Sequence, residues 1–283
     1  MYKATIFYFS GTGNTWWVSD KIEKQLNARN INAEAVSIDS LTDGCRLDTK
    51  KADWLIKSSD LLFFGWPIYG SDLPEPMKKF IDTLNPLEKE KHVHTFCTQM
   101  YFSGDGAWLY HKNFEAKNLK LDSCAHFLMP SNVSIWHGAM GPPKTQEKTD
   151  KILSKCEKAI EKHINSLLDG KAGIKGKRSY PIGIMQRGPY RAFYKRFQDW
   201  MGVDTSLCTK CGLCAELCPS CNISLKEYPE FSGHCALCFR CYAMCPVSAV
   251  TVRGKTHDKS KHGLPYRIPD KRFNKDLLKP KSK

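Results

Sequence analysis

The sequence contains no apolar run that approaches the roughly 18 residues needed to span a bilayer. Its N-terminus also lacks the charged stretch, the apolar stretch of roughly 7–15 residues and the small-residue cleavage site of a secretory leader. We therefore expect a cytoplasmic protein without a membrane span. In that compartment thiols stay reduced and disulfides are rare.

Acidic residues are too few to balance the basic ones, with 29 Asp and Glu against 43 Lys and Arg and a net charge of +14. The excess is local, because residues 171–203 carry +7 and residues 253–283 carry +8, whereas residues 1–170 are neutral. Basic segments can bind nucleic acid, but no nucleic-acid motif accompanies them here. We therefore expect no nucleic-acid partner, and interpret the segments as a solvated tail and a docking surface for an acidic redox protein.

Cysteine, by contrast, is abundant, and nine of the thirteen lie between residues 208 and 246. Eight of these form two copies of a C-x2-C-x2-C-x3-C-P pattern, which is typical of the bacterial two-cluster ferredoxin run. Three closely spaced thiolates bind one cubane, and the fourth cysteine of each run binds the other cluster. The predicted [4Fe–4S] ligands are Cys208, Cys211, Cys214 and Cys245 for the first cluster, and Cys235, Cys238, Cys241 and Cys218 for the second.

Zinc and disulfides are the alternatives for these cysteines. Zinc sites favour CxxC pairs separated by a longer spacer, which fits the repeated pattern poorly, and disulfides are unexpected without a leader. Cys221 is surplus because each cubane already has four ligands, and Cys45, Cys97, Cys124 and Cys156 show no ligand spacing. Since oxygen attacks exposed cubanes, we expect the source to be an anaerobic or microaerobic organism.

The first 170 residues alternate short apolar runs with helical patterns, which is typical of a parallel α/β sheet. Right-handed crossovers then predict a doubly wound five-stranded sheet of order 2-1-3-4-5. The predicted strands are residues 4–9, 33–38, 61–64, 93–98 and 125–129, and the predicted helices are residues 15–29, 76–84, 106–116 and 145–168.

The loop after the first predicted strand favours an anion site. Backbone N–H groups and the dipole of the following helix point into such a loop. Glycines let the backbone approach a ligand closely, and hydroxyl groups add neutral donors. No lysine follows and no GxGxxG is present, which disfavours a nucleoside triphosphate or a dinucleotide and favours one monophosphate. The loop consists of Ser10, Gly11, Thr12, Gly13, Asn14 and Thr15.

This loop resembles, residue for residue, the (S/T)-x-T-G-x-T phosphate loop of flavodoxins, which bind FMN. Together with the two cysteine runs, the chain is similar to the flavodoxin–ferredoxin fusion family. The resemblance implies a flavodoxin-like FMN-binding domain at residues 1–170, a basic linker with an amphipathic helix at 171–203, a small α+β ferredoxin-like domain with two [4Fe–4S] clusters at 204–252, and a basic tail at 253–283.

In flavodoxins two further loops supply aromatic rings for the flavin faces and backbone groups for its polar edge. Ligands of such sheets lie beyond the carboxyl ends of the strands, and the resemblance therefore assigns the loops after the third and fourth strands to the flavin ring. Backbone contact with the flavin is expected from the Gly104–Gly106 turn. The assigned residues are Trp66, Pro67, Ile68, Tyr69 and Gly70 in one loop, and Tyr101, Phe102, Ser103, Gly104, Asp105 and Gly106 in the other.

The linker begins with a Gly- and Lys-rich stretch at residues 171–177, which we expect to be flexible. Residues 190–200 carry one apolar helical stripe. A membrane surface would accept such a helix, but we favour a position between the two domains.

No catalytic acid, base or nucleophile is evident in the sequence, so whether the chain is an enzyme stays open. The sequence predicts an electron-transfer protein that passes electrons between FMN, two [4Fe–4S] clusters and an external redox partner. The alternative is an FMN-dependent reductase of a small acceptor, such as a quinone, nitro or azo compound. A weaker third hypothesis is a redox sensor whose basic tail contacts nucleic acid.

Overall fold

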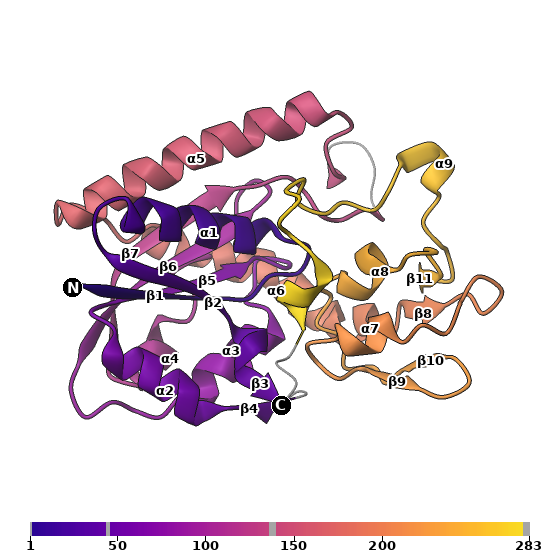
Figure 1. Ribbon diagram of the computed structural model, residues 1–283, viewed down its shortest axis with the longest axis horizontal. Coiled ribbons are helices and arrows are strands. Elements are labelled where there is room, and N and C mark those ends of the chain that lie inside the picture. Colours follow the sequence, from indigo (N-terminus) through magenta and orange to yellow (C-terminus); the bar gives the residue numbers. More distant parts are fainter. Residues whose placement is uncertain (1, 44–45, 136–139, 280–283) are drawn as a thin grey trace.

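A five-stranded parallel sheet forms the core of the N-terminal part of the chain (Figure 1). The computed structural model describes residues 2–43, 46–135 and 140–279. The strand order is β2-β1-β5-β6-β7, which confirms the predicted order of the five strands. The strands are β1 (Lys3–Tyr8), β2 (Asn32–Ser37), β5 (Leu61–Pro67), β6 (Lys91–Gln99) and β7 (Leu119–Leu128).

Helices cover both faces of this sheet, because its strands are apolar on both sides. On one face α1 (Asn14–Asn27) and α5 (Gln146–Leu168) enclose a core with Ile6, Phe63 and Phe96. The opposite face is covered by α2 (Thr49–Ser58), α3 (Glu75–Thr83) and α4 (His111–Glu115). Sequence patterning missed α2 and the short strands β3 (Thr42–Asp43) and β4 (Arg46–Leu47), and it placed the start of α4 too early.

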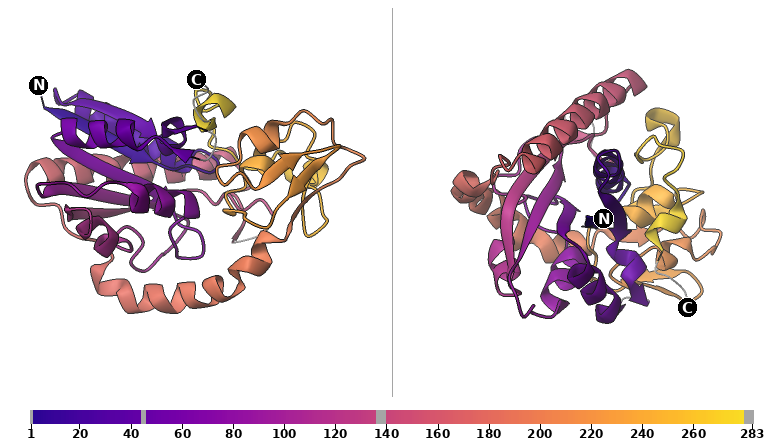
Figure 2. Two further views of the ribbon diagram at one scale, coloured as in Figure 1. Left: turned by 90° about the horizontal axis from the view of Figure 1, so that it is seen from below. Right: turned by 60° about the vertical axis from the view of Figure 1, so that its left-hand side comes forward.

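The linker contacts the sheet near its start, within the stretch that we expected to be flexible. Ile174 forms a parallel bridge with Cys124 at the edge of β7, and the N–H of Lys175 donates to the carbonyl of Cys124. The turn η3 (Lys177–Ser179) then leads into α6 (Tyr180–Gln198), which contains Pro189. Figure 2 shows α6 as a bowed helix at the outer edge of the molecule, reaching from the sheet to the cysteine-rich part.

The cysteine-rich part is built from two small antiparallel pairs and two single-turn helices. β8 (Met201–Val203) pairs with β11 (Val250–Val252), and β9 (Ile223–Leu225) pairs with β10 (Pro229–Phe231). Each cysteine run contains one of these helices. The first run contains α7 (Leu213–Glu216), and the second contains α8 (Arg240–Met244).

The two cysteine runs share a backbone pattern as well as a spacing. Left-handed φ values recur at equivalent positions 27 residues apart. A backbone that brings several cysteines around one cluster needs tight bends between them. The equivalent pairs are Lys210 and Leu237, Gly212 and Phe239, and Cys221 and Ser248, with φ between 46° and 75°. A side chain other than glycine costs about 1–2 kcal/mol in this conformation, so the surrounding structure must impose the bends.

Within the described residues, the basic C-terminal segment packs against the rest of the molecule. This corrects our interpretation of that segment as a solvated tail. After α9 (Lys259–His262) the chain returns across the N-terminus of α1 and reaches η4 (Lys275–Leu278) beside the first half of the sheet (Figure 1). Ile268 is buried in the core that α1 and α5 form, and Phe273 packs on Trp16. We call residues 264–279 the C-terminal strap.

Within the described residues, no helix is long and apolar enough to cross a membrane.

Candidate functional site

The loop at residues 10–15 is shaped by its glycines and by its own hydroxyl groups. Gly13 has φ of 105° and serves as the N-cap of α1, and its N–H donates to Ser10 Oγ over 3.2 Å. Thr15 is fully buried, with its Oγ1 2.9 Å from Thr98 Oγ1 on β6. Thr12 Oγ1 is buried and has no hydrogen-bond partner. A buried hydroxyl without a partner is costly, so this loop fits a ligand that supplies the missing bond.

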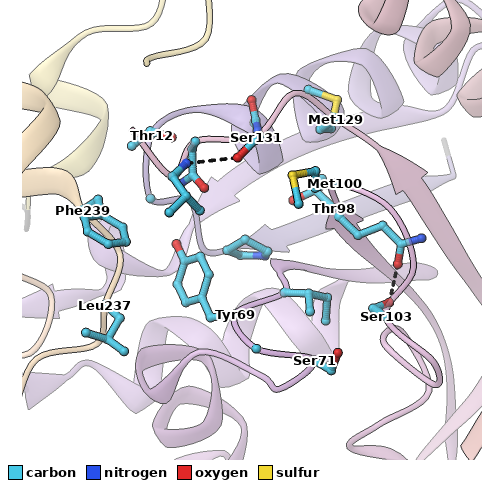
Figure 3. Close-up of a pocket in the computed structure, with 18 of the residues that line it drawn as sticks. Thr12, Tyr69, Ser71, Thr98, Met100, Ser103, Met129, Ser131, Leu237 and Phe239 are labelled. Atoms are coloured by element: carbon cyan, nitrogen blue, oxygen red, sulfur yellow. Dashed lines mark hydrogen bonds between the residues drawn. The ribbon is translucent and has the colours of Figure 1, made fainter. Parts of the chain in front are cut away.

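A cavity of about 420 Å³ opens beside this loop, at the carboxyl ends of the strands (Figure 3). Its volume lies in the range of small-molecule and cofactor sites. Twelve of the seventeen residues that the sequence predicts for a cofactor line it: Ser10, Gly11, Thr12, Asn14, Thr15, Pro67, Ile68, Tyr69, Gly70, Tyr101, Phe102 and Ser103.

Trp66 does not line the cavity, which corrects its assignment as a ring-stacking residue. Its side chain is fully buried among Phe64 and Phe114 on the far face of the sheet, and its Nε1 donates to the Gly106 carbonyl. Successive side chains of a strand point to opposite faces. Trp66 still lies within β5 and therefore faces the core, whereas the chain has left the sheet at Tyr69.

The Gly104–Gly106 turn also lies away from the cavity lining, because α6 covers it. A Cβ at position 104 would lie 2.5 Å from the Cα of Gly183 in α6. Asp105 is fully buried and accepts two hydrogen bonds from Arg187, at 2.6 and 2.8 Å. The turn thus anchors the linker helix. Gly13, the remaining predicted residue, contacts Ile268 of the C-terminal strap instead of the cavity.

Sequence reasoning missed the residues that close the cavity from the linker and the cysteine-rich part. Figure 3 shows Leu237 and Phe239 on the side of the cavity where Thr12 and Tyr69 lie, across from Met100 and Ser103. Tyr190, Phe197 and Trp200, from α6 and the residues just after it, complete this wall. The apolar stripe at 190–200 was the signal for the α6 side, but nothing in the sequence indicated which surface it meets.

Tyr69 lies where the two parts of the molecule touch. A Cβ at position 11 would lie 2.5 Å from Tyr69 Oη and 2.7 Å from the carbonyl oxygen of Cys238, so glycine is needed there. Tyr69 Oη is buried and has no hydrogen-bond partner. Burial raises the pKa of Tyr69, with the nearby Cys238 thiol adding to the effect, and the phenol therefore stays neutral and able to donate.

The four cysteines predicted for the first cluster line one small cavity. Cys208, Cys211 and Cys214 meet Cys245 from the other run there, together with Val203. The backbone N–H of Ala249 donates to Cys245 Sγ over 3.2 Å. Hydrogen bonds of this kind stabilise a thiolate and tune an iron–sulfur cluster.

The four cysteines of the second set also lie near one another. Burial raises the pKa of Cys241, and the neighbouring Cys235, Cys238 and Cys218 raise it further. Cys218 Sγ accepts a hydrogen bond from the N–H of Asn222, and Cys235 Sγ accepts one from Leu237. None of the eight predicted ligands lies in a disulfide, whereas Cys221 does.

Nothing in the described residues favours the zinc alternative. No three His, Cys, Asp or Glu side chains there are arranged to hold a single metal ion. A cubane is a much larger body, so its four thiolates stand further apart than those around one ion. The N–H groups that donate to the thiols and the repeated tight bends fit the predicted cubanes.

Arg240 connects the second cysteine run to the phosphate loop. Its guanidinium is 1% exposed and forms a bidentate ion pair with Asp39, at 2.9 and 2.7 Å. It also donates to the Ser10 carbonyl through Nε and Nη2, at 3.0 and 2.7 Å, and stacks over the Phe9 ring. Asp39 raises the already high pKa of Arg240 against the effect of burial, so this side chain keeps its charge.

Two sequence comparisons identify relatives of the two parts. Residues 201–220 match the 4Fe-4S binding domain family. A flavodoxin of Megasphaera elsdenii is 32% identical over 106 residues, which cover 37% of this chain and 69% of that protein.

Solved flavodoxin structures resemble the N-terminal part. The two-electron reduced flavodoxin of Megasphaera elsdenii is 22% identical, with a TM-score of 0.39, over 56% of this chain and 96% of that one. A flavodoxin from the domain Archaea is 19% identical, with a TM-score of 0.39, over 56% of this chain and 94% of that one.

The match to the Megasphaera flavodoxin, the strand order and the match to the 4Fe-4S family all occur in the same chain. The chain belongs to the flavodoxin family, as a flavodoxin–ferredoxin fusion, and is an electron-transfer flavoprotein with a 4Fe-4S binding segment.

Proposed function

We propose that this protein passes electrons between an FMN and two [4Fe–4S] clusters on the same chain, and onward to an external redox partner. One observation carries the proposal. Leu237 and Phe239, which alternate with the ligands of the second predicted cluster, line the same cavity as the phosphate loop. The fold therefore supports a direct approach of the flavin to that cluster.

The residues around the cavity suit FMN. The loop at 10–15 would hold the phosphate through backbone N–H groups at the start of α1, with Thr12 Oγ1 completing its unmet hydrogen bond. Tyr69 and the apolar wall of Tyr190, Phe197 and Phe239 would exclude water from the ring. FMN would supply the ability to take two electrons together or one at a time, whereas a cubane passes one.

The burial of the cysteines suggests an order along the chain. Cys235, Cys238 and Cys241 are buried next to the flavin cavity, whereas Cys211 of the first set is exposed. We place the second cluster beside the flavin and the first cluster at the surface where an external partner exchanges electrons.

Anaerobic purification followed by iron, sulfide and flavin assays tests the cofactor content. About eight iron atoms and one FMN per chain are expected from two cubanes and one phosphate loop. About four iron atoms in the intact protein would refute the two-cluster proposal.

Crossed ligation is tested by Cys245→Ser. This change should damage the cluster bound by Cys208, Cys211 and Cys214 and leave the other cluster largely intact, because Cys245 lies with those three. Electron paramagnetic resonance of the reduced protein distinguishes the two clusters. Selective loss of the second cluster would contradict the assignment.

A second candidate function rests on the opposite rim of the cavity. Tyr101 and Phe102 are 58% and 51% exposed there, which leaves room for a small planar acceptor. In that case the chain is a reductase of a quinone, nitro or azo compound. Saturable turnover of such a compound, lost in Phe102→Ala but with cofactor content unchanged, would favour this function.

A further inference from the structure

The outward face of α6 carries large apolar side chains that the fold leaves exposed. They span most of the helix and lie on both sides of its Pro189 bend. Met185 is 70% exposed, which is more than any other large apolar side chain among the described residues. The others are Ile182, Ile184 and Phe193, exposed by 44–51%. Scattered exposed apolar residues are normal, but a contiguous set marks an interaction surface.

The opposite face of the same helix is held firmly by both parts of the molecule. Arg187 pairs with Asp105, and Arg191 donates to Asp72 at 2.7 and 3.1 Å. At the other end, Tyr194 and Gln198 donate to the carbonyl of Cys235. The exposed apolar face is therefore the fixed outer side of a docked helix, and no rotation of the helix could bury it without breaking these contacts.

The charge carried by α6 and by the segment before it has one sign, although Asp169 and Asp199 stand just outside this stretch. Residues 170–198 contain no Asp or Glu and eight basic residues. Arg187 and Arg191 point inward to their carboxylate partners. Arg191 stays half-exposed in its pair, and Lys171 pairs with Asp169. The other exposed basic residues are Lys175, Lys177, Arg178, Lys195 and Arg196, which flank the apolar side chains at both ends of α6.

We propose that this face of α6 binds the surface of an anionic lipid bilayer. A basic helix with a broad apolar face lies in the plane of the membrane interface, with its apolar side chains among the acyl chains and its cations at the lipid phosphates. The shape favours a bilayer over a folded partner. α6 is bowed outward at the edge of the molecule, as Figure 2 shows, and a convex ridge enters a soft interface without needing a matching groove.

This surface is next to the proposed flavin site. Tyr190 and Phe197 lie on the inner side of α6 and line the 420 Å³ cavity, so membrane binding would hold the cavity beside the bilayer. The inference itself needs no flavin chemistry, because it rests on the exposed side chains and charge of α6.

Sedimentation of the full-length holoprotein with vesicles tests the proposal. Binding is expected to vesicles of phosphatidylcholine with about 30% phosphatidylglycerol, and only weakly to phosphatidylcholine alone. Raising the salt from about 0.05 M to about 0.5 M should weaken binding, because it shortens the Debye length. Equal binding to both kinds of vesicle, or to neither, would overturn the proposal.

Two double variants separate insertion from simple charge attraction. Ile184→Glu with Met185→Glu should weaken binding to anionic vesicles at least about tenfold, because carboxylates replace the inserting side chains. Lys195→Glu with Arg196→Glu should weaken it by about fivefold or more for each residue. If only the charge variant loses binding, the surface is an electrostatic site of the kind that fits an acidic protein, and the lipid proposal is wrong.

The matched controls place the same changes elsewhere on the surface. Leu225→Glu with Leu264→Glu alters side chains that are 54% and 64% exposed on the cysteine-rich part and the C-terminal strap. These changes should leave vesicle binding unchanged. Flavin and iron content, measured for every variant, shows that a loss of binding does not come from unfolding.

Discussion

Arg240 is the side chain through which the second cysteine run, the sheet and the phosphate loop contact one another. It stands between Cys238 and Cys241, pairs with Asp39 in the turn just after β2, and donates to the Ser10 carbonyl. A buried charge that loses its partner is strongly destabilising, whereas a buried pair replaced as a whole is often neutral. Loss of Arg240 alone should therefore destabilise the protein more than loss of Arg240 and Asp39 together.

Arg240→Met should lower the free energy of unfolding by about 3–5 kcal/mol, because it leaves Asp39 buried without its cation. The double variant Asp39→Leu with Arg240→Met should recover most of that loss. Chemical denaturation of all three proteins measures the coupling. Arg191→Met is the control, since Arg191 is half-exposed in its pair with Asp72 and its removal should cost less. A single Arg240 variant as stable as the parent would contradict this role.

His126 should make the fold sensitive to mild acid. Its Nε2 accepts a hydrogen bond from the N–H of Ala107, and burial lowers its pKa to about 4. Below about pH 6.5 the unfolded chain binds a proton that the folded chain refuses, so stability falls as the pH drops toward 4. One such histidine contributes up to about 1.4 kcal/mol per pH unit in that window.

Thermal unfolding between pH 7 and pH 5 checks this expectation. His126→Gln should flatten the dependence. Buried His94 and half-buried His163, whose pKa values burial also lowers to about 4, should retain part of it. Greater stability at pH 5 than at pH 7 would contradict the predicted loss of stability in acid.

At the scale of elements, the C-terminal strap gives the phosphate loop its outer wall. The N–H of Ile268 donates to the Thr12 carbonyl, and Tyr266 Oη donates to Asn14 Oδ1. Arg272 forms two hydrogen bonds with Asp20 on α1, at 2.6 and 3.0 Å. The strap therefore holds the loop from the side opposite the cavity.

Ile268→Ala should destabilise the protein by about 2–5 kcal/mol and weaken FMN binding, because it leaves a cavity against Gly13 and loosens the phosphate loop. Isothermal titration of the flavin-free protein with FMN measures the second effect. Leu264→Ala is the matched control, since Leu264 is 64% exposed and should change neither property. Unchanged flavin affinity in the Ile268 variant would show that the strap does not support flavin binding.

At the scale of the whole molecule, the proposed path runs from the exposed first cluster through the second cluster to the flavin. Cys211→Ser should therefore slow reduction of the flavin by a reduced bacterial ferredoxin, because Cys211 is an exposed predicted ligand of the first cluster. Anaerobic stopped-flow absorbance measures the rate. Flavin that is reduced at the parental rate in this variant would contradict the order.

Much of the fold and of the candidate site follows from local patterns. The strand order was predictable because apolar runs alternate with amphipathic helices, and right-handed crossovers leave few topologies. The phosphate loop and the cysteine runs are contiguous motifs, so their residues could be predicted from the sequence pattern. Trp66 and the Gly104–Gly106 turn were misassigned because a residue near a strand end faces the core or the site according to where the strand stops.

The sequence by itself determined the chemistry of this protein: eight thiolates in two runs, a phosphate loop, and the sheet that positions it. Only the tertiary structure decided what these parts face. Leu237, Phe239, Arg240 and Ile268 meet the loop from positions more than 200 residues away. Such contacts depend on how separate apolar and charged surfaces pack, and no local periodicity encodes them. The cavity between the two parts therefore became visible only in three dimensions.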